Sequence, residues 1–140
     1  MRSILVNSLL FLTLTAGVLV LPSAATTSVT SVVVPSITAP RSTIFVHTGV
    51  SNLSLTNEAV TVTLKITNPG TCVSGSVIPS NVGAFALGLR AKETRLAGLS
   101  LDIPASACSG TYTVTVTVEN SAGTILATHT TSFQVEIPTP

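Results

Sequence analysis

The chain has 140 residues, of which 45% are hydrophobic and 8% charged, with a formal net charge of +1. This length is too short for two ordinary domains. A nearly neutral chain has no long-range field that would attract nucleic acid or anionic lipid, and we exclude both as partners on this ground.

The first 25 residues are typical of a secretory signal peptide. A short cationic start with Arg2 precedes an almost wholly apolar run from Ile4 to Leu21, and small residues follow up to Ala25. We expect cleavage after Ala25, so that the chain touches a membrane only through this segment before cleavage. The mature protein would then be secreted, periplasmic or at the cell surface. The alternative is an uncleaved anchor, because the run is near the lower length for a spanning helix.

Residues 26–42 form an arm that is rich in Ser, Thr and Pro. This composition is typical of a linker or a stalk. The valines between Val29 and Val34 instead favour an edge strand that ends at Pro35, because proline cannot donate a hydrogen bond to a neighbouring strand. Such a loosely attached strand could also add to the open edge of a neighbouring subunit.

Apolar and hydroxyl side chains alternate through much of residues 43–137. The pattern is clearest in Ala59–Thr67 and in Gly110–Asn120, where aliphatic residues alternate mainly with Thr. Because successive side chains of a strand point to opposite faces, this period predicts half-buried antiparallel strands. Further strands are expected at Thr43–Thr48 (ended by Gly49), at Val73–Ile78 and at Thr124–Ile137, and residues 138–140 form a tail.

The segment between residues 81 and 101 allows two interpretations. Two alternating stretches flank a charged turn, which indicates a strand, a turn and a second strand. A helix over Val82–Leu99 is the alternative, although Gly83, Gly88 and Gly98 would each weaken it by about 1 kcal/mol relative to alanine. With the strand interpretation, the chain is predicted to be all-β, an antiparallel immunoglobulin-like sandwich of about seven strands preceded by a cleaved signal peptide.

Cys72 and Cys108 are the two cysteines of the chain. Cysteines of an exported chain usually pair, and we expect this disulfide on that ground. It would close a loop of about 37 residues, worth on the order of 4 kcal/mol. Standard immunoglobulin topology, however, would put three strands between the cysteines and therefore place them at opposite ends of the sandwich, too far apart to bond. Either the chain crosses an even number of times between them, or they do not pair.

Two stretches, VTVTLKITNPG (Val60–Gly70) and LDIPASACSGTYTVTVTV (Leu101–Val118), resemble exported bacterial immunoglobulin-like modules of the CARDB and NEW3 type. In those families a strand ends in an Asn-x-Gly turn, and a later Pro-x-x-x-x-x-Gly-x-Tyr segment leads into a Val-rich strand. Pro104, Gly110 and Tyr112 fit that pattern. The resemblance implies an accessory or cell-surface module without catalytic residues. Tyr112 is also similar to the tyrosine-corner position of these sandwiches, which implies a structural role for it.

No group of residues indicates catalysis or a bound metal or cofactor. His47 and His129 would have to converge with a carboxylate such as Glu136 to hold a metal, and no short ligand spacing supports this. The chain lacks Gly-x-Ser-x-Gly, and nothing places Glu93 and Asp102 across a cleft. We therefore expect no enzyme activity, no cofactor and no metal.

Arg90, Lys92 and Arg95, with Glu93 between them, form the one polar cluster of the sequence. Such a charge group is usually the solvated tip of a hairpin, and the alternative is a contact with a protein or cell-surface partner. Asn52-Leu53-Ser54 is a glycosylation sequon. The three phenylalanines of the mature chain, at positions 45, 85 and 133, lie in strand-like apolar patterns, which disfavours an exposed aromatic platform for sugars.

These features predict a secreted or cell-surface immunoglobulin-like module with a structural, adhesive or protein-binding role and no catalysis. The alternative is a self-assembling subunit of the pilus or surface-layer type, in which the Val-rich arm adds as a strand to a neighbour.

Overall fold

The computed structural model describes residues 26–72, residue 78 and residues 81–140. The predicted signal peptide lies outside the described residues, as does the predicted strand Val73–Ile78 except for Ile78. The described residues form eight strands: β1 (Thr27–Val33), β2 (Ile37–Thr38), β3 (Thr43–Asn52), β4 (Glu58–Thr67), β5 (Asn81–Leu89), β6 (Thr94–Asp102), β7 (Gly110–Asn120) and β8 (Ile125–Val135). Within this part of the chain, no helix is long and apolar enough to span a membrane.

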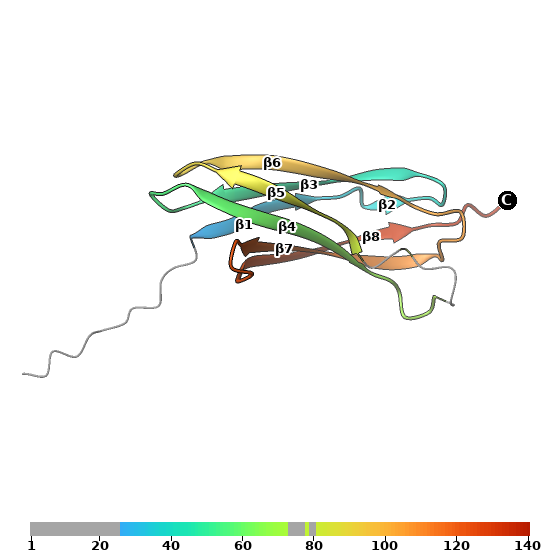
Figure 1. The fold of residues 1–140 in the computed structure, drawn as a ribbon. Helices are drawn as coiled ribbons and strands as arrows, with labels where there is room; N and C mark the ends of the chain where they lie inside the picture. The colour runs from blue at the N-terminus through green and yellow to red at the C-terminus, as the bar shows by residue number, and fades with distance from the viewer. Residues whose placement is uncertain (1–25, 73–77, 79–80) are drawn as a thin grey trace, which may run out of the picture.

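The strands form two sheets that lie face to face (Figure 1). One sheet has three strands in the order β1-β3-β6, and the other has five in the order β2-β8-β7-β4-β5. All neighbours are antiparallel except the short β2, which pairs in parallel with β8. The predicted all-β immunoglobulin-like sandwich is confirmed. Residues 81–101 form β5, a turn and β6, as the strand interpretation expected.

The long strand β7 lies in the middle of the five-stranded sheet, between β4 and β8. Its residues Tyr112, Val114, Val116 and Val118 are all 0% exposed, whereas the threonines between them lie on the opposite, partly exposed face. The period of two in the sequence therefore separates the core side of β7 from its solvent side, as predicted. Residues from both sheets complete the core, among them Val46 and Leu101 from the three-stranded sheet.

Strand β3 is longer than predicted, because Gly49 does not end it. The strand continues to Asn52 and pairs with β1 on one side and β6 on the other. A side chain at position 49 would collide with Thr30 and Ser31, where β1 has a bulge. Glycine is thus needed here for the close approach of β1 and not as a strand breaker.

The arm is part of the sandwich. Its strand β1 pairs with β3, and β2 pairs with β8. Thr27 is 0% exposed, and its hydroxyl donates to Glu58 Oε2 at 2.5 Å. Addition of the arm to a neighbouring subunit would therefore require β1 to leave β3.

The buried side chain of Asn52 joins the loop after β3 to the turn after β5, at one end of the sandwich. Its Nδ2 donates to the carbonyls of Thr56 (2.8 Å) and Arg90 (3.0 Å), and its Oδ1 accepts from the backbone N–H of Ser54 (2.9 Å). Asn52 is 0% exposed. The amide nitrogen of the sequon is thus enclosed in the folded protein, where it cannot carry a glycan.

Replacing Asn52 with alanine should lower the free energy of unfolding by about 2 kcal/mol, because the carbonyls of Thr56 and Arg90 and the N–H of Ser54 lose the hydrogen bonds of a buried amide. Denaturant unfolding would measure the change. Leu55→Ala is the control: Leu55 lies in the same loop but is 82% exposed, and its loss should cost no more than about 0.5 kcal/mol. Equal effects of the two substitutions would contradict the role assigned to Asn52.

Candidate functional site

The two cysteines lie at the same end of the sandwich. Cys72 comes after β4 and Cys108 before β7, and these strands are antiparallel neighbours, so the end of one lies beside the start of the other. The described residues between the cysteines contain two strands, β5 and β6, which carry the chain away and back. The Cα atoms are 5.7 Å apart and the predicted disulfide is formed. The expectation of three intervening strands, which argued against the bond, does not hold for the described residues.

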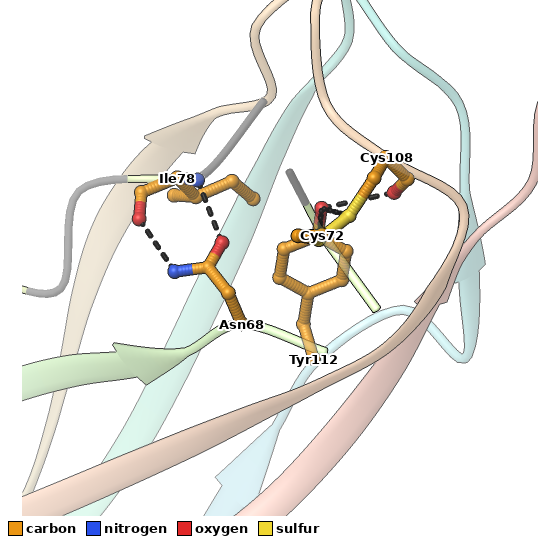
Figure 2. The surroundings of a disulfide bond; sticks show 5 residues. All are labelled: Asn68, Cys72, Ile78, Cys108 and Tyr112. Carbon is orange, nitrogen blue, oxygen red and sulfur yellow. Dashed lines mark hydrogen bonds between the residues drawn. A yellow bond between two sulfur atoms is a disulfide. The ribbon is translucent and has the colours of Figure 1, made fainter. Parts of the chain in front are cut away.

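Tyr112 lies directly beneath the disulfide (Figure 2). Its hydroxyl donates to the carbonyl of Cys108 at 2.9 Å. The Sγ atom of Cys108 lies 3.1 Å from the hydroxyl oxygen of Tyr112. The ring is stacked on Phe133, with the centroids 5.4 Å apart. Burial raises the pKa of Tyr112 above its ordinary value, because the charged phenolate loses its hydration. These contacts join the loop before β7 to the core.

Gly110 begins β7 in a conformation that side chains rarely adopt, with φ at +138°. A Cβ at this position would lie 3.0 Å from Cγ of Pro69. The glycine therefore allows the turn after β4 to pass close to the start of β7, next to the disulfide.

Asn68 holds the segment that follows β4. Its side-chain amide donates to the carbonyl of Ile78 at 2.8 Å and accepts from the N–H of Ile78 at 2.7 Å (Figure 2). The amide thus makes the two bonds that a paired strand would make. Ile78 itself is 1% exposed and belongs to the core. This end of the molecule is occupied by groups that stabilise one another.

The predicted polar cluster lies at the opposite end, on the turn between β5 and β6. Glu93 Oε2 accepts from the backbone N–H of Arg90 at 2.6 Å, and Arg95 Nη1 donates to the carbonyl of Gly88 at 3.0 Å. The Lys92 ammonium donates to the carbonyl of Leu53. The structure therefore brings the three cations together around one turn, and two of them hold backbone carbonyls. Their contact with a partner stays a prediction.

The two histidines do not converge. His47 lies on β3 of the three-stranded sheet and His129 on β8 of the five-stranded sheet, and both are exposed. Asp102 accepts a hydrogen bond from the hydroxyl of Thr43 at 2.6 Å. Among the residues that the structure describes, no three His, Cys, Asp or Glu side chains form a group that could hold a metal ion.

The outer face of the three-stranded sheet carries an apolar surface that sequence reasoning missed. Phe45 is 57% exposed, Val33 57% and Leu96 78%. Val33 of β1 pairs with His47 of β3. On the other side of β3, His47 pairs with Gly98 of β6, and Leu96 is two residues from Gly98 on the same face. The Phe45 and His47 rings are stacked at 6.3 Å between centroids. We refer to Val33, Phe45, His47 and Leu96 as the outer-face patch.

The expectation that all three phenylalanines lie in apolar faces is wrong for Phe45. Phe133 is 1% exposed and Phe85 is half-buried, but Phe45 points to solvent. The sequence could have revealed this exposure by the alternation along β3. Phe45 shares a face with Thr43 and His47, whereas Ile44 and Val46 form the buried face.

No family model matches the chain, and no curated protein is similar to it in sequence. Solved structures with similar folds exist. The CARDB domain of the PF1109 protein from Pyrococcus furiosus, determined in complex with di-metal ions, has a TM-score of 0.58 and 15% identity, over 79% of this chain and 86% of that domain. Its solution structure has a TM-score of 0.56 and 17% identity, over 79% of this chain and 92% of that one.

Similar modules are also parts of larger proteins. The alkylpurine DNA glycosylase AlkC from Pseudomonas fluorescens has a TM-score of 0.60 and 16% identity, over 80% of this chain but 31% of that chain. The β-glucuronidase 2 of Bacteroides uniformis has a TM-score of 0.60 and 14% identity, over 76% of this chain and 14% of that chain. At these identities the likeness concerns the fold alone. The predicted CARDB-like immunoglobulin fold is confirmed.

Replacing both cysteines, as Cys72→Ser/Cys108→Ser, should lower the free energy of unfolding by about 4 kcal/mol, because the unfolded chain gains the freedom of the opened loop. Denaturant unfolding of the oxidised protein and of the variant would measure this. A reductant should destabilise the wild type to the level of the variant and leave the variant unchanged. A wild type insensitive to full reduction would contradict the prediction.

Replacing Tyr112 with phenylalanine should cost about 1–2 kcal/mol at neutral pH, because the Cys108 carbonyl loses its donor. The pKa of Tyr112 is raised in the folded protein from the ordinary value of 10.0. The folded state therefore binds this proton more tightly than the unfolded state, and wild-type stability should fall as pH rises above about 10. This decline should be smaller in Tyr112→Phe, and a parallel decline in both proteins would contradict the assignment. Tyr112 is the only tyrosine, so tyrosinate absorbance reports it directly.

Proposed function

We propose that this chain is an exported, non-catalytic immunoglobulin-like module with a structural, adhesive or protein-binding role, and that it contacts a protein partner through the outer-face patch. The observation that carries the proposal is the 57% exposure of Phe45 on the outer face of the three-stranded sheet. Large apolar side chains that gather on an exposed surface mark interaction sites in soluble proteins. Aromatic residues in particular are enriched in protein interfaces.

The shape of the patch supports a protein contact. Val33 and Phe45 line a shallow hollow of about 370 Å³, together with Pro35 and His47. Gly98 leaves room for the His47 ring, since a Cβ there would lie 3.3 Å from His47 Nδ1. An apolar side chain of a partner could enter this hollow and stack against Phe45.

The three cations lie away from this hollow. Phe45 pairs with Ser100 near one end of β3, whereas the turn with Arg90 and Lys92 lies at the other end, beyond the Ser51–Thr94 pair. Arg95 points to the opposite face of β6 from Leu96, since its Nη1 donates to the carbonyl of Gly88 on β5. A contact of these cations with a partner would therefore form a separate surface.

The disulfide supports export, because such bonds persist in oxidising compartments outside the cytosol. The predicted signal peptide points the same way, and we therefore propose a secreted, periplasmic or cell-surface location. We do not extend to this chain the metal binding of the similar CARDB domain, because the described His, Cys, Asp and Glu side chains form no group of three.

A photo-crosslinking amino acid at position 45 would test the proposal in the exporting host. Phe45→p-benzoylphenylalanine should give a discrete protein adduct on irradiation, and the same substitution at Thr61 should not. Thr61 is exposed on the outer face of the other sheet and is the matched control. The yield of this adduct should fall at least about tenfold when Leu96→Ser is added, since the substitution removes part of the apolar contact and weakens binding.

Adducts of equal yield from positions 45 and 61, or none from position 45, would contradict the proposed contact surface. Both proteins should first show the same circular dichroism spectrum, so that a loss of adduct is not a loss of fold.

A further inference from the structure

Four strands lie at sheet edges in the described part of the chain: β1 and β6 in one sheet, β2 and β5 in the other. An edge strand presents unpaired backbone groups, and proteins usually protect it by a bulge, a charge, a proline or short length. β1 has a bulge after Val29, β2 has two residues, and β6 contains Arg95 and Asp102. β5, with the sequence NVGAFALGL, has neither a charge nor a proline, and its one irregularity, at Val82, lies outside the regularly paired residues Gly83–Leu89.

One hydrogen bond shows to which side the backbone N–H and C=O groups of β5 point. Gly88 accepts from Arg95 Nη1 of β6 at 3.0 Å, so its carbonyl points away from β4. Residues Gly83–Leu89 pair with β4 in uniform register, since the register shift lies beyond Gly83. Successive residues of a strand point their N–H and C=O groups to opposite sides, so Ala84 and Ala86, like Gly88, direct these groups to the open side of β5.

The side chains at these positions leave room for another strand. Ala84, Ala86 and Gly88 are exposed on the outer face of the five-stranded sheet, and all three are small. On the core side, Phe85 is half-buried and packs against the core at this edge, as does Leu99 of β6. A strand added at this edge would pair with the backbone of Ala84 and Ala86 and cover Phe85.

We propose that β5 pairs antiparallel with β5 of a second copy of this chain, about a two-fold axis at Phe85. Ala84 then lies opposite Ala86 of the second copy, and Phe85 faces Phe85 of the second copy on the core side. The two phenylalanines form a cross-strand aromatic pair, which is among the favourable pairs of antiparallel sheets.

A second copy fits this edge better than an unrelated strand, because the strand is complementary to itself. A two-fold axis repeats the same contact in both directions. The uncharged residues Gly83–Leu89 bring no like charges together. Arg90 and Arg95 lie near one end of β5, so the antiparallel arrangement keeps the cations of the two copies at opposite ends. Because Arg95 already occupies the carbonyl of Gly88, the pairing is limited to the middle of β5.

The double substitution Ala84→Lys/Ala86→Lys tests the proposal, since each lysine would lie opposite a lysine of the second copy. Thr61→Lys/Thr63→Lys is the matched control: these residues pair with Ala86 and Ala84 on the next strand, β4, away from the edge. Proteins expressed from the full-length sequence and purified after export would be compared by sedimentation equilibrium. The wild type should associate, the edge variant at least about tenfold more weakly, and the control within about twofold of the wild type.

Amide hydrogen exchange of the wild type locates the contact without any substitution. Protection of the Ala84 and Ala86 amides should rise with protein concentration, whereas protection in β1 should not. The proposal is overturned if the wild type stays monomeric up to about 1 mM, if the edge variant associates as well as the wild type, if the control loses association equally, or if concentration protects other amides in place of these.

Discussion

The antiparallel pairing of β4 with β7 joins the centre of the core to the disulfide. Both strands bury one complete face, with Val62 and Leu64 on β4 and Val114 and Val116 on β7 each at 2% exposure or less. Their pairing is continuous from Val60–Asn120 to Thr67–Thr113. Because the strands are antiparallel, the segment after β4 and the segment before β7 lie at the same end. The disulfide therefore follows from the same pairing that builds the core.

Side-chain amides complete the sandwich where strands end. Asn68 makes two hydrogen bonds with the backbone of Ile78 beside the disulfide, and Asn52 binds the carbonyls of Thr56 and Arg90 at the other end. Buried backbone groups need such partners, since an unpaired one costs free energy comparable to a lost hydrogen bond. Both ends are thus occupied by structural contacts. The outer-face patch and the open edge of β5 lie away from these contacts.

These two surfaces differ in what they can recognise. The outer-face patch presents apolar side chains, of which Phe45 is the largest. The β5 edge presents backbone groups and small side chains, and its recognition would come from strand pairing. Since the surfaces lie on different sheets, a dimer formed through β5 would leave the patch of each copy free. The dimer would then carry two patches, and a partner that binds one of them would meet the second at a raised effective concentration.

Much of the local structure could be predicted because alternation directly reflects burial. The period of two in β4 and β7 identified both strands and their core faces. Other residues have roles that the sequence could not reveal, because those roles depend on distant neighbours. Gly49 looks like a strand breaker, but it makes room for β1, which is paired alongside it. Asn52 has the sequence of a glycan acceptor, yet its amide is enclosed by a loop and by a turn 38 residues away.

The sequence by itself determined that this protein is an all-β sandwich, because alternating apolar and hydroxyl side chains can bury only one face of each strand. It also provided the two cysteines, but not the reason why they can meet. The tertiary structure decided that question, since the number of crossings between two residues sets the end at which each one lies. It likewise decided which strands are edges and that Phe45 faces solvent, because the partners of a strand come from remote parts of the chain.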